Sequence, residues 1–325
     1  MNLSQSYKNI IDTELEKLNI NLKKLIIAKQ PMLKAASEYM FLKKGKKIRP
    51  IIVLLVSKIV NLNSKINSAQ QRLAEITEII HTATLLHDDV VDESILRRGS
   101  STVNKIYNNQ IAILAGDFLF AQSSWYIANI NNLQVVKNIS KVIKDLAEGE
   151  ISQNSNKFNN QLSITDYLEK SFYKTASLIA ASSNSAAILG ESNIVVNRQF
   201  YNYGKNIGLA FQIIDDILDI NSSPKILGKP IGIDLQAGNL TAPILFALTR
   251  NSILLEIINR EFYQKDDVLK AKNLILYSDA VQESLDLAFE HIQAAINSIK
   301  DIPESFAKNS LIKISYSIIE ECQFN

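Results

Sequence analysis

The sequence predicts an all-α protein folded as one large helical bundle. Only 10 Gly and 6 Pro interrupt 325 residues, which is fewer turn signals than a many-stranded sandwich or barrel needs. Hydrophobic residues make up 46% and charged residues 21% of the chain, as in soluble globular proteins with a substantial core. Apolar residues recur at helical spacing in most segments. We therefore expect a single domain covering residues 1–325.

Two segments show the helical pattern most clearly. Each carries five apolar side chains at the spacing of one helix face: Leu73, Ile76, Ile80, Ala83 and Leu86 in the first, and Ile207, Ala210, Phe211, Ile214 and Leu218 in the second. Polar stretches at 61–67, 129–132, 154–160 and 221–230 predict the connections between helices. No internal repeat or linker divides the chain.

Charge and hydropathy restrict the partners of the protein. The 35 basic and 33 acidic residues are well mixed and give a net charge of +2, so no broad basic field favours nucleic acid. The apolar run at 51–56 is far shorter than the ~18 residues that span a bilayer, and the acidic first segment is unlike a signal or transit peptide. We expect no transmembrane segment and a soluble or peripheral protein. The single cysteine, Cys322, excludes an intrachain disulfide and is compatible with a reducing compartment.

Two Asp-Asp-x-x-Asp clusters carry the strongest chemical signal. In LLHDDVVDESILRRG, Asp88 and Asp92 are four residues apart and share a helix face, whereas Asp89 is rotated by roughly 100°. The pattern returns in FQIIDDILDI with Asp215 and Asp219. One such cluster alone could be a charged helix face, but two with the same spacing indicate metal binding. Oxygen ligands without nearby cysteine favour Mg²⁺, which completes its shell with phosphate oxygens and water.

Basic residues stand where they could bind the phosphate oxygens of such a complex. Arg97 and Arg98 follow the first cluster by just over one helical turn, and an early basic group comprises Lys44, Lys46, Lys47 and Arg49. Lys174 and Lys229 lie near polar breaks. For Lys44 and Lys47 simple solvent exposure is the favoured interpretation. A lone helical histidine is more often structural than functional, but His81 lies two turns before Asp88 on a similar face.

Several ordered motifs resemble those of the trans-isoprenyl diphosphate synthase (polyprenyl synthase) family. They are KKGKKIRP, HTATLLHDDVVDESILRRGSSTVN, AILAGDFLFA, EGEISQ, YKTASL, FQIIDDILD and GKPIGIDLQAGNLTAP, and within the family they are most similar to the long-chain, solanesyl-type synthases of cyanobacteria and plastids. The resemblance implies the isoprenoid synthase fold, a bundle of long antiparallel helices around a deep central cavity, and a homodimer. It also implies condensation of isopentenyl diphosphate with an allylic diphosphate to a long-chain polyprenyl diphosphate, for example for the side chain of plastoquinone, with about two or three Mg²⁺ ions per active site.

The resemblance assigns roles to individual residues. The positions that bind isopentenyl diphosphate are Lys46, Arg49, His81 and Arg98. The metal ligands are Asp88, Asp92, Asp215 and Asp219. The allylic diphosphate site comprises Arg97, Lys174, Thr175, Gln212 and Lys229, with Thr175 and Gln212 beside the developing allylic cation.

The sequence departs from the family pattern at three places. The usual Gly-Gly-Lys-Arg is Lys-Gly-Lys-Lys at 44–47, which keeps the charge but loses one glycine and one guanidinium. Asn239 replaces a lysine common in the late motif, so one phosphate contact is absent or supplied by another residue. The C-terminal ISYSIIEECQFN lacks the basic ending of some relatives, which puts closure of the active site by the tail in doubt.

Product length depends on the wall of the cavity. Ala83 and Thr84 precede Asp88 by about one turn, on the wall along which a growing chain would run, and both are small. A bulky aromatic here stops growth early in the family, so we expect a long product, although Ala83 is also a good helix former. The alternatives are a geranylgeranyl-type synthase, a weakly active regulatory subunit, or a class I terpene cyclase. The two intact clusters and FQIIDDILD argue against the last two. The family and the Ile/Asn/Lys-rich composition favour the plastid stroma, if the gene is plastid-encoded, or a bacterial cytoplasm.

Overall fold

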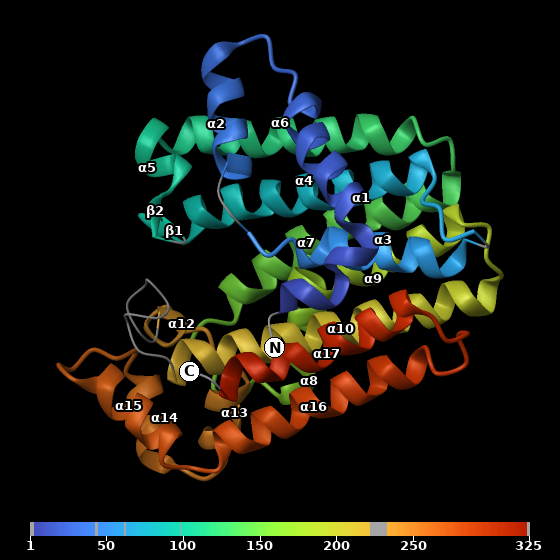
Figure 1. Ribbon diagram of the computed structural model, residues 1–325. Coiled ribbons are helices and arrows are strands. Elements are labelled where there is room, and N and C mark those ends of the chain that lie inside the picture. Colours follow the sequence, from blue (N-terminus) through green and yellow to red (C-terminus); the bar gives the residue numbers. More distant parts are fainter. Residues whose placement is uncertain (1–2, 43–44, 62, 98, 222–232, 324–325) are drawn as a thin grey trace. The chain divides into compact units, whose positions relative to one another are not determined.

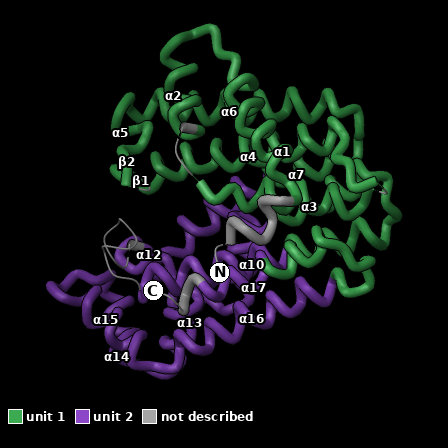
Figure 2. Tube along the Cα trace, in the orientation of Figure 1, with its two compact units in different colours: residues 1–143, 178–204, 299–313 green, residues 144–177, 205–298, 314–325 purple. Residues whose placement is uncertain are grey.

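Helices dominate the computed structural model, which describes residues 3–42, 45–61, 63–97, 99–221 and 233–323 (Figure 1). The all-α prediction is therefore confirmed. The only strands among these residues are β1 (Leu96–Arg97) and β2 (Ser100–Ser101), a short antiparallel pair in which Leu96 lies opposite Ser101. The chain divides into two compact units, each made of segments that are far apart in the sequence (Figure 2). The expectation of a single domain stays a prediction.

Unit 1 comprises residues 1–143, 178–204 and 299–313. Its elements are α1 (Leu3–Leu25), α2 (Pro31–Leu42), α3 (Ile48–Val60), α4 (Ser68–Val91), the β pair, α5 (Val103–Tyr107), α6 (Asn109–Ala128), the first half of α7 (Leu133–Ser155), most of α9 (Ser177–Leu189), the start of α10 (Ile194–Asn221) and the start of α17 (Phe306–Gln323). The helix α4 packs against α1, α3, α5 and α6. It therefore forms the core of this unit, and it carries the first aspartate cluster at its C-terminal end.

The core of unit 1 follows the predicted helix faces. All five apolar residues predicted for the first face lie on α4 and are fully buried. The short apolar run at 51–56 belongs to α3, whose residues 50–57 are all buried. A helix that is apolar all round belongs inside a protein. Ser57 fits there because its hydroxyl donates to the carbonyl of Val53 at 2.7 Å.

A capping box fixes the start of α4. The Asn67 side chain accepts a hydrogen bond from the backbone N–H of Gln70 at 2.8 Å, and the Gln70 side chain accepts one from the backbone of Asn67 at 3.1 Å. Such a cap stabilises a helix by about 1 kcal/mol. The predicted connections at 61–67 and 129–132 match the ends of α3 and α6, and that at 154–160 begins two residues before the observed connection at 156–163. The predicted connection at 221–230 lies outside the described residues except for residue 221.

Unit 2 comprises residues 144–177, 205–298 and 314–325. It contains the second half of α7, α8 (Ile164–Ser171), the π-helix η1 (Phe172–Ala176), most of α10, α12 (Ile233–Gln236), α13 (Ala242–Leu248), α14 (Ser252–Asn259), α15 (Asp267–Leu276), α16 (Ala280–Ser298) and the end of α17. The helix α13 packs against α8, α14, α15 and α16. On α10, Ile207, Ala210 and Ile214 are buried as predicted, whereas Phe211 and Leu218 are partly exposed.

Two glycines let neighbouring helices approach η1 closely. A Cβ on Gly208 of α10 would lie 2.4 Å from the Cα of Ala176, and one on Gly149 of α7 would lie 3.0 Å from the Cβ of Tyr173. Residues of η1 therefore touch the backbones of α7 and α10 almost directly. Because π-helical turns are rare and are frequent at functional sites, this packing marks the segment that holds Lys174 and Thr175.

Among the described residues, one helix is long and apolar enough to cross a membrane by length and composition. This is α6, whose mean hydropathy reaches 1.3 over its most apolar window and of which 33% is buried in the structure. It differs from the run at 51–56, which lies in the core. The expectation of no transmembrane segment rested on the front of the chain, where α6 does not lie.

Candidate active site

The last turn of α4 presents the first aspartate cluster. Asp88 is half-buried, and Asp92 is exposed as the C-cap residue, with its backbone N–H donating to the carbonyl of Asp88 at 2.8 Å. Asp89 points the other way, as the helical geometry predicted, and only 1% of it is exposed. Its carboxylate accepts a hydrogen bond from Nε of Arg97 at 2.7 Å. Arg97 lies on β1 and not on a continued helix, because α4 ends at Val91 and the chain turns at Gly99 with a φ of 72°.

The ends of α4 and α10 are unfavourable places for carboxylates. The C-terminus of a helix carries a partial negative charge, and each acid there costs typically ~0.3–1 kcal/mol. Three aspartates occupy the end of α4, three more lie within the last two turns of α10, and neither helix has a basic residue in its last turn. Both helix ends therefore favour the binding of a cation.

Two of the predicted isopentenyl diphosphate contacts meet in unit 1. Nη1 of Arg49, in the first turn of α3, lies 3.2 Å from Nε2 of His81 on α4. Both side chains are partly exposed. His81 also lines a small pocket with Lys47 and Glu78. Lys46 is exposed nearby in sequence, and the position of Arg98 lies outside the described residues.

The wall residues lie on the same helix. Ala83 is fully buried, whereas Thr84 is partly exposed and donates its hydroxyl to the carbonyl of His81 at 2.8 Å. The assignment of both to the wall of a product cavity stays a prediction.

The second aspartate cluster, on α10 in unit 2, divides into exposed and buried members. Asp215 is exposed and Asp219 is partly exposed, whereas Asp216 is only 4% exposed. The neighbours of these acids in FQIIDDILDI are mostly apolar, and Asp216 is buried with them whereas Asp215 is not. Oδ2 of Asp219 accepts from the backbone N–H of Asp234 at 3.3 Å. Asn239, which stands in place of the common lysine, is buried and donates Nδ2 to Asp234 at 3.1 Å.

A chain of hydrogen bonds leads from α8 to η1 through Asp216. The hydroxyl of Tyr167 donates to Oδ2 of Asp216 at 2.6 Å, and Nε2 of Gln212 donates to its Oδ1 at 2.8 Å. The hydroxyl of Thr175 then donates to Oε1 of Gln212 at 2.6 Å. Thr175 and Gln212, which the sequence assigns to the same subsite, are therefore in direct contact.

Burial changes the pKa values of Asp216 and Tyr167 in this hydrogen-bond chain. Desolvation, reinforced by the charge of Asp234 and opposed by that of Lys170, raises the pKa of Asp216 to about 8. Burial and the neighbouring Asp216 together raise the pKa of Tyr167 well above its ordinary value. A divalent cation at the adjacent carboxylates would favour the ionised form of Asp216 and oppose this rise.

Lys174 lies on η1 and is ion-paired within unit 2. Its Nζ lies 2.8 Å from Oε2 of Glu150 and 3.2 Å from Oε1 of Gln153, both on α7. Less than a quarter of each partner of the ion pair is exposed. A diphosphate bound here would share Lys174 with Glu150. Lys229, the other predicted lysine, lies outside the described residues.

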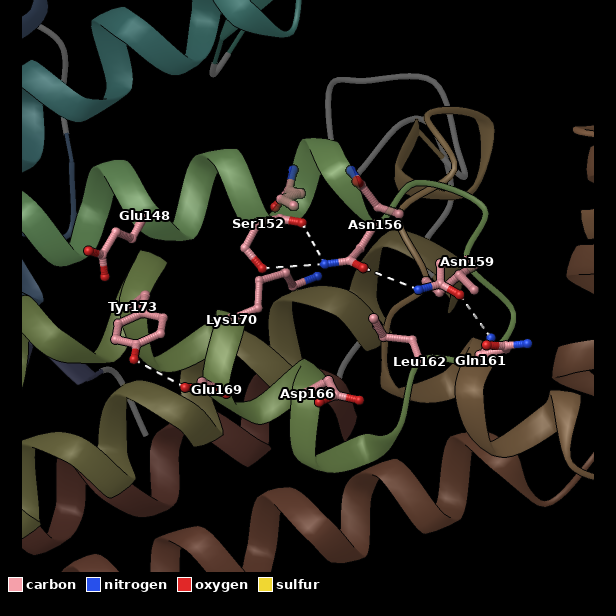
Figure 3. A pocket seen from close by; sticks show the side chains of 13 residues that line it. Glu148, Ser152, Asn156, Asn159, Gln161, Leu162, Asp166, Glu169, Lys170 and Tyr173 are labelled. Carbon is pink, nitrogen blue, oxygen red and sulfur yellow. Dashed lines mark hydrogen bonds between the residues drawn. The ribbon is translucent and has the colours of Figure 1, made fainter.

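A pocket of about 470 Å³ opens in unit 2 beside these residues (Figure 3). Lys170 extends from α8 toward α7 (Figure 3), and burial lowers the pKa of its ammonium group. The lining is mainly polar, and it comprises Glu148, Ser152, Gln153, Asn156, Asn159, Gln161, Leu162, Asp166, Glu169, Lys170, Tyr173, Asn239 and Leu240. This pocket does not include the predicted wall residues Ala83 and Thr84, and the deep product cavity implied by the resemblance stays a prediction.

The donor set fits a hard divalent cation that is completed by substrate oxygens. Within the described part of the chain, no three His, Cys, Asp or Glu side chains gather closely enough to hold a metal by themselves. Mg²⁺ is typically bound by one or two carboxylates and takes its remaining ligands from phosphates and water. The pair Asp88 and Asp92, and the pair Asp215 and Asp219, each offer that number of carboxylates.

Sequence reasoning missed several members of the site. Tyr167, Glu150, Gln153 and Lys170 were not predicted, although EGEISQ is one of the motifs that carry the family resemblance. The buried role of Asp216 had one available signal, because its position in Asp-Asp-x-x-Asp turns it about 100° from Asp215.

Comparisons with known proteins show the family of this chain. A family model described as polyprenyl synthetase matches residues 30–275. A prenyl transferase of Cyanidium caldarium is 63% identical over 304 residues, covering 93% of this chain and 94% of that protein. The chloroplastic solanesyl-diphosphate synthase 2 of Oryza sativa subsp. japonica is 46% identical over 309 residues, covering 94% and 77%.

A solved structure gives the same result for the fold. The polyprenyl synthase of Caulobacter crescentus CB15, complexed with calcium and isoprenyl diphosphate, superposes with a TM-score of 0.91 at 30% identity and covers 97% of this chain and 96% of that one. The predicted isoprenoid synthase fold and enzyme class are thus confirmed. The chain belongs to the polyprenyl synthetase family.

Proposed function

We propose that this protein is a polyprenyl diphosphate synthase that condenses isopentenyl diphosphate with an allylic diphosphate to make a long-chain product. The single observation that carries the proposal is the pair of aspartate clusters, each at the acidic end of a helix, in a chain of this family. The solanesyl-diphosphate synthase among the relatives favours a long product, and so does the small, buried Ala83.

The reaction requires an allylic carbon–oxygen bond to break, so negative charge builds on the leaving diphosphate. In our proposal Asp88, Asp92, Asp215 and Asp219 hold Mg²⁺, which when bound stabilises that developing charge as a Lewis acid. Lys174 and Arg97 contribute positive charge to the same diphosphate. Stabilisation that is stronger in the transition state than in the ground state accelerates the reaction, and no protein nucleophile is required.

The second substrate must be held in position to attack. We assign its diphosphate to Lys46, Arg49 and His81, together with Arg98. Holding both reactants in one site replaces a bimolecular encounter with a pre-oriented one, which contributes up to about 7–11 kcal/mol in well-aligned systems. We assign to Thr175 and Gln212 the stabilisation of the positive charge on the allylic cation. Loss of a proton then gives an allylic product that can enter another cycle.

We further propose a homodimer located in the plastid stroma or a bacterial cytoplasm. Exposed apolar side chains on α6, namely Ile113, Leu114 and Trp125, support an association surface. The location is supported by the chloroplastic relative of Oryza sativa.

The test is a product assay with purified protein. It is incubated with labelled isopentenyl diphosphate, Mg²⁺ and, in turn, geranyl, farnesyl and geranylgeranyl diphosphate, and the dephosphorylated products are sized by chromatography. We expect products longer than geranylgeranyl, no turnover with excess EDTA, and recovery on adding Mg²⁺. A C20 product alone would instead support the geranylgeranyl-type alternative, and complete inactivity with every starter would support the regulatory subunit.

Single substitutions test the metal assignment. Asp92→Asn and Asp215→Asn each remove a proposed ligand and should lower kcat by about 10²–10³-fold, because a loss of roughly 3–4 kcal/mol of leaving-group stabilisation corresponds to that factor. Asp286→Asn, which neutralises an exposed carboxylate on α16, is the matched control and should retain wild-type activity. Equal activity of all three variants would refute the assignment.

A further inference from the structure

We infer that Tyr167 is a positioning residue for prenyl transfer, acting through Asp216 to fix the amide of Gln212 and the hydroxyl of Thr175. The inference rests on the proposed function, in which Gln212 and Thr175 stand beside the allylic cation. Tyr167 itself is fully buried on α8 and was not predicted from the sequence. It is placed to act on the cation only through its neighbours.

The hydrogen-bond chain is continuous and short. Its three bonds, Tyr167 to Asp216, Gln212 to Asp216 and Thr175 to Gln212, measure 2.6, 2.8 and 2.6 Å. The side chains of Tyr167 and Asp216 are almost completely removed from water, with 0% and 4% exposed. A capping box between Ser163 and Asp166 anchors the start of α8 at Ile164, three residues before Tyr167. The phenol therefore sits in a fixed place from which it can hold the carboxylate.

The donor and acceptor groups of these side chains allow the hydrogen-bond chain to run in only one direction. The NH₂ group of Gln212 can only donate, and it faces Oδ1 of Asp216, while the hydroxyl of Tyr167 donates to Oδ2 of the same carboxyl group. The amide carbonyl of Gln212 must then face Thr175, whose only hydroxyl hydrogen it accepts. The hydroxyl oxygen of Thr175 keeps its lone pairs, and these favour a neighbouring positive charge.

Without the phenol hydroxyl of Tyr167, the hydrogen bonds through Asp216, Gln212 and Thr175 would no longer be fixed in one direction. Asp216 would keep its burial but lose one of its two donors, and a buried acceptor without a partner is costly. The carboxylate of Asp216 could instead pair with Lys170, whose charge already acts on it. A shift of the carboxylate toward Lys170 would loosen the amide of Gln212, and the oxygens of Gln212 and Thr175 would no longer be held in a pre-organised position. Pre-organisation is what makes such groups effective in a transition state.

The experiment uses Tyr167→Phe, which removes one oxygen atom and keeps the buried ring. We expect kcat to fall about 10–100-fold, somewhat less than the loss of a donor that touches the reacting atoms, while KM for both diphosphates changes less than about twofold. An ammonium analogue of the allylic cation, added with inorganic diphosphate, should bind about 10–100-fold more weakly. A merely structural role would lower the melting temperature without this selective loss for the cationic analogue.

A matched control and a double mutant test the path of action. Tyr203 is also fully buried, and its hydroxyl donates to the backbone carbonyl of Leu311 at 3.0 Å. Tyr203→Phe therefore removes a buried phenol hydroxyl that is not part of the hydrogen-bond chain, and it should leave kcat and analogue binding unchanged. If Tyr167 acts through Gln212, the double variant Tyr167→Phe/Gln212→Ala should be no slower than Gln212→Ala alone. Full additivity of the two losses would overturn the inference.

Two further outcomes are decisive. If Tyr167→Phe does not fold, Asp216→Asn is the second variant, since asparagine keeps the size but can present an N–H to Gln212, and the same loss of kcat and analogue affinity is expected. Wild-type kcat and analogue binding in the folded variant would overturn the inference while leaving the proposed function intact. Failure of the wild-type protein to form any product would instead refute the proposed function itself.

Discussion

Replacing Gly208 with alanine tests how closely α10 must approach η1. The added Cβ would lie 2.4 Å from the Cα and 2.6 Å from the Cβ of Ala176, whereas carbon atoms in contact are normally about 3.5–4.0 Å apart. The two segments would have to separate by about 1 Å. Overpacking of this kind costs about 1–3 kcal/mol, and a backbone contact places the cost near the upper limit.

The net effect is smaller because alanine favours the helix. Replacing glycine within a helix stabilises it by about 1 kcal/mol, so a steric cost of about 3 kcal/mol leaves a net destabilisation of about 2 kcal/mol. At roughly 2–4 °C per kcal/mol for a large domain, the melting temperature should fall by about 4–8 °C. Activity should fall as well, because η1 carries Lys174 and Thr175.

The assay is thermal unfolding followed by circular dichroism, with kcat/KM for the allylic diphosphate measured on the same samples. Gly149→Ala is a graded control, because its Cβ would meet neighbouring atoms at 3.0–3.3 Å and needs a shift of only a few tenths of an ångström. Here the steric cost and the helix gain should nearly cancel. A Gly208→Ala variant that melts at or above the wild-type temperature would refute the reasoning.

Two further substitutions probe product length and acid stability. Ala83→Phe fills a fully buried position on α4 and should shorten the product in the sizing assay; an unchanged product length would reject Ala83 as a wall residue. Hydrogen bonds from Arg260 and from the backbone N–H of Gln264 lower the pKa of the fully buried Asp267. Because its folded-state pKa lies below the unfolded value, the stability that Asp267 contributes is present above the ordinary range near pH 4 and is lost as the pH falls through the folded pKa. The stability difference between wild type and Asp267→Asn, followed by urea unfolding from pH 7 to pH 3, should therefore shrink toward the acid end, and Asp286→Asn should show no such trend; a difference that stays constant across this range would contradict the assignment.

The helical framework could be predicted because its signals are local and repeated. The face of α4 follows directly from apolar spacing, and Asn67 marks its start with a capping residue three positions before Gln70. The polar stretch before it ends one helix and begins the next. Signals of this kind depend on residues only a few positions apart, so one sequence is enough to detect them.

The details of the site depended on contacts between distant residues. Tyr167 and Asp216 are 49 positions apart, and neither residue type indicates the other. Arg97 was expected just over one helical turn after the first aspartate cluster, but α4 ends at Val91, Arg97 lies on β1, and its guanidinium group pairs with Asp89. The π-helical turn at Phe172–Ala176 depends on close packing against two glycines, which no local propensity reveals.

The crowding of aspartates at the ends of α4 and α10 has a consequence for the resting enzyme. Like charges repel where Asp88 and Asp92, and likewise Asp215 and Asp219, share one helix face, so these helix ends should fray more readily than the rest of either helix. Binding of a cation and an organic pyrophosphate would reduce this fraying. Part of the affinity for substrate therefore comes from repulsion that was already built in when the chain folded, and a cell short of isoprenoid precursors would hold this enzyme in its least protected form.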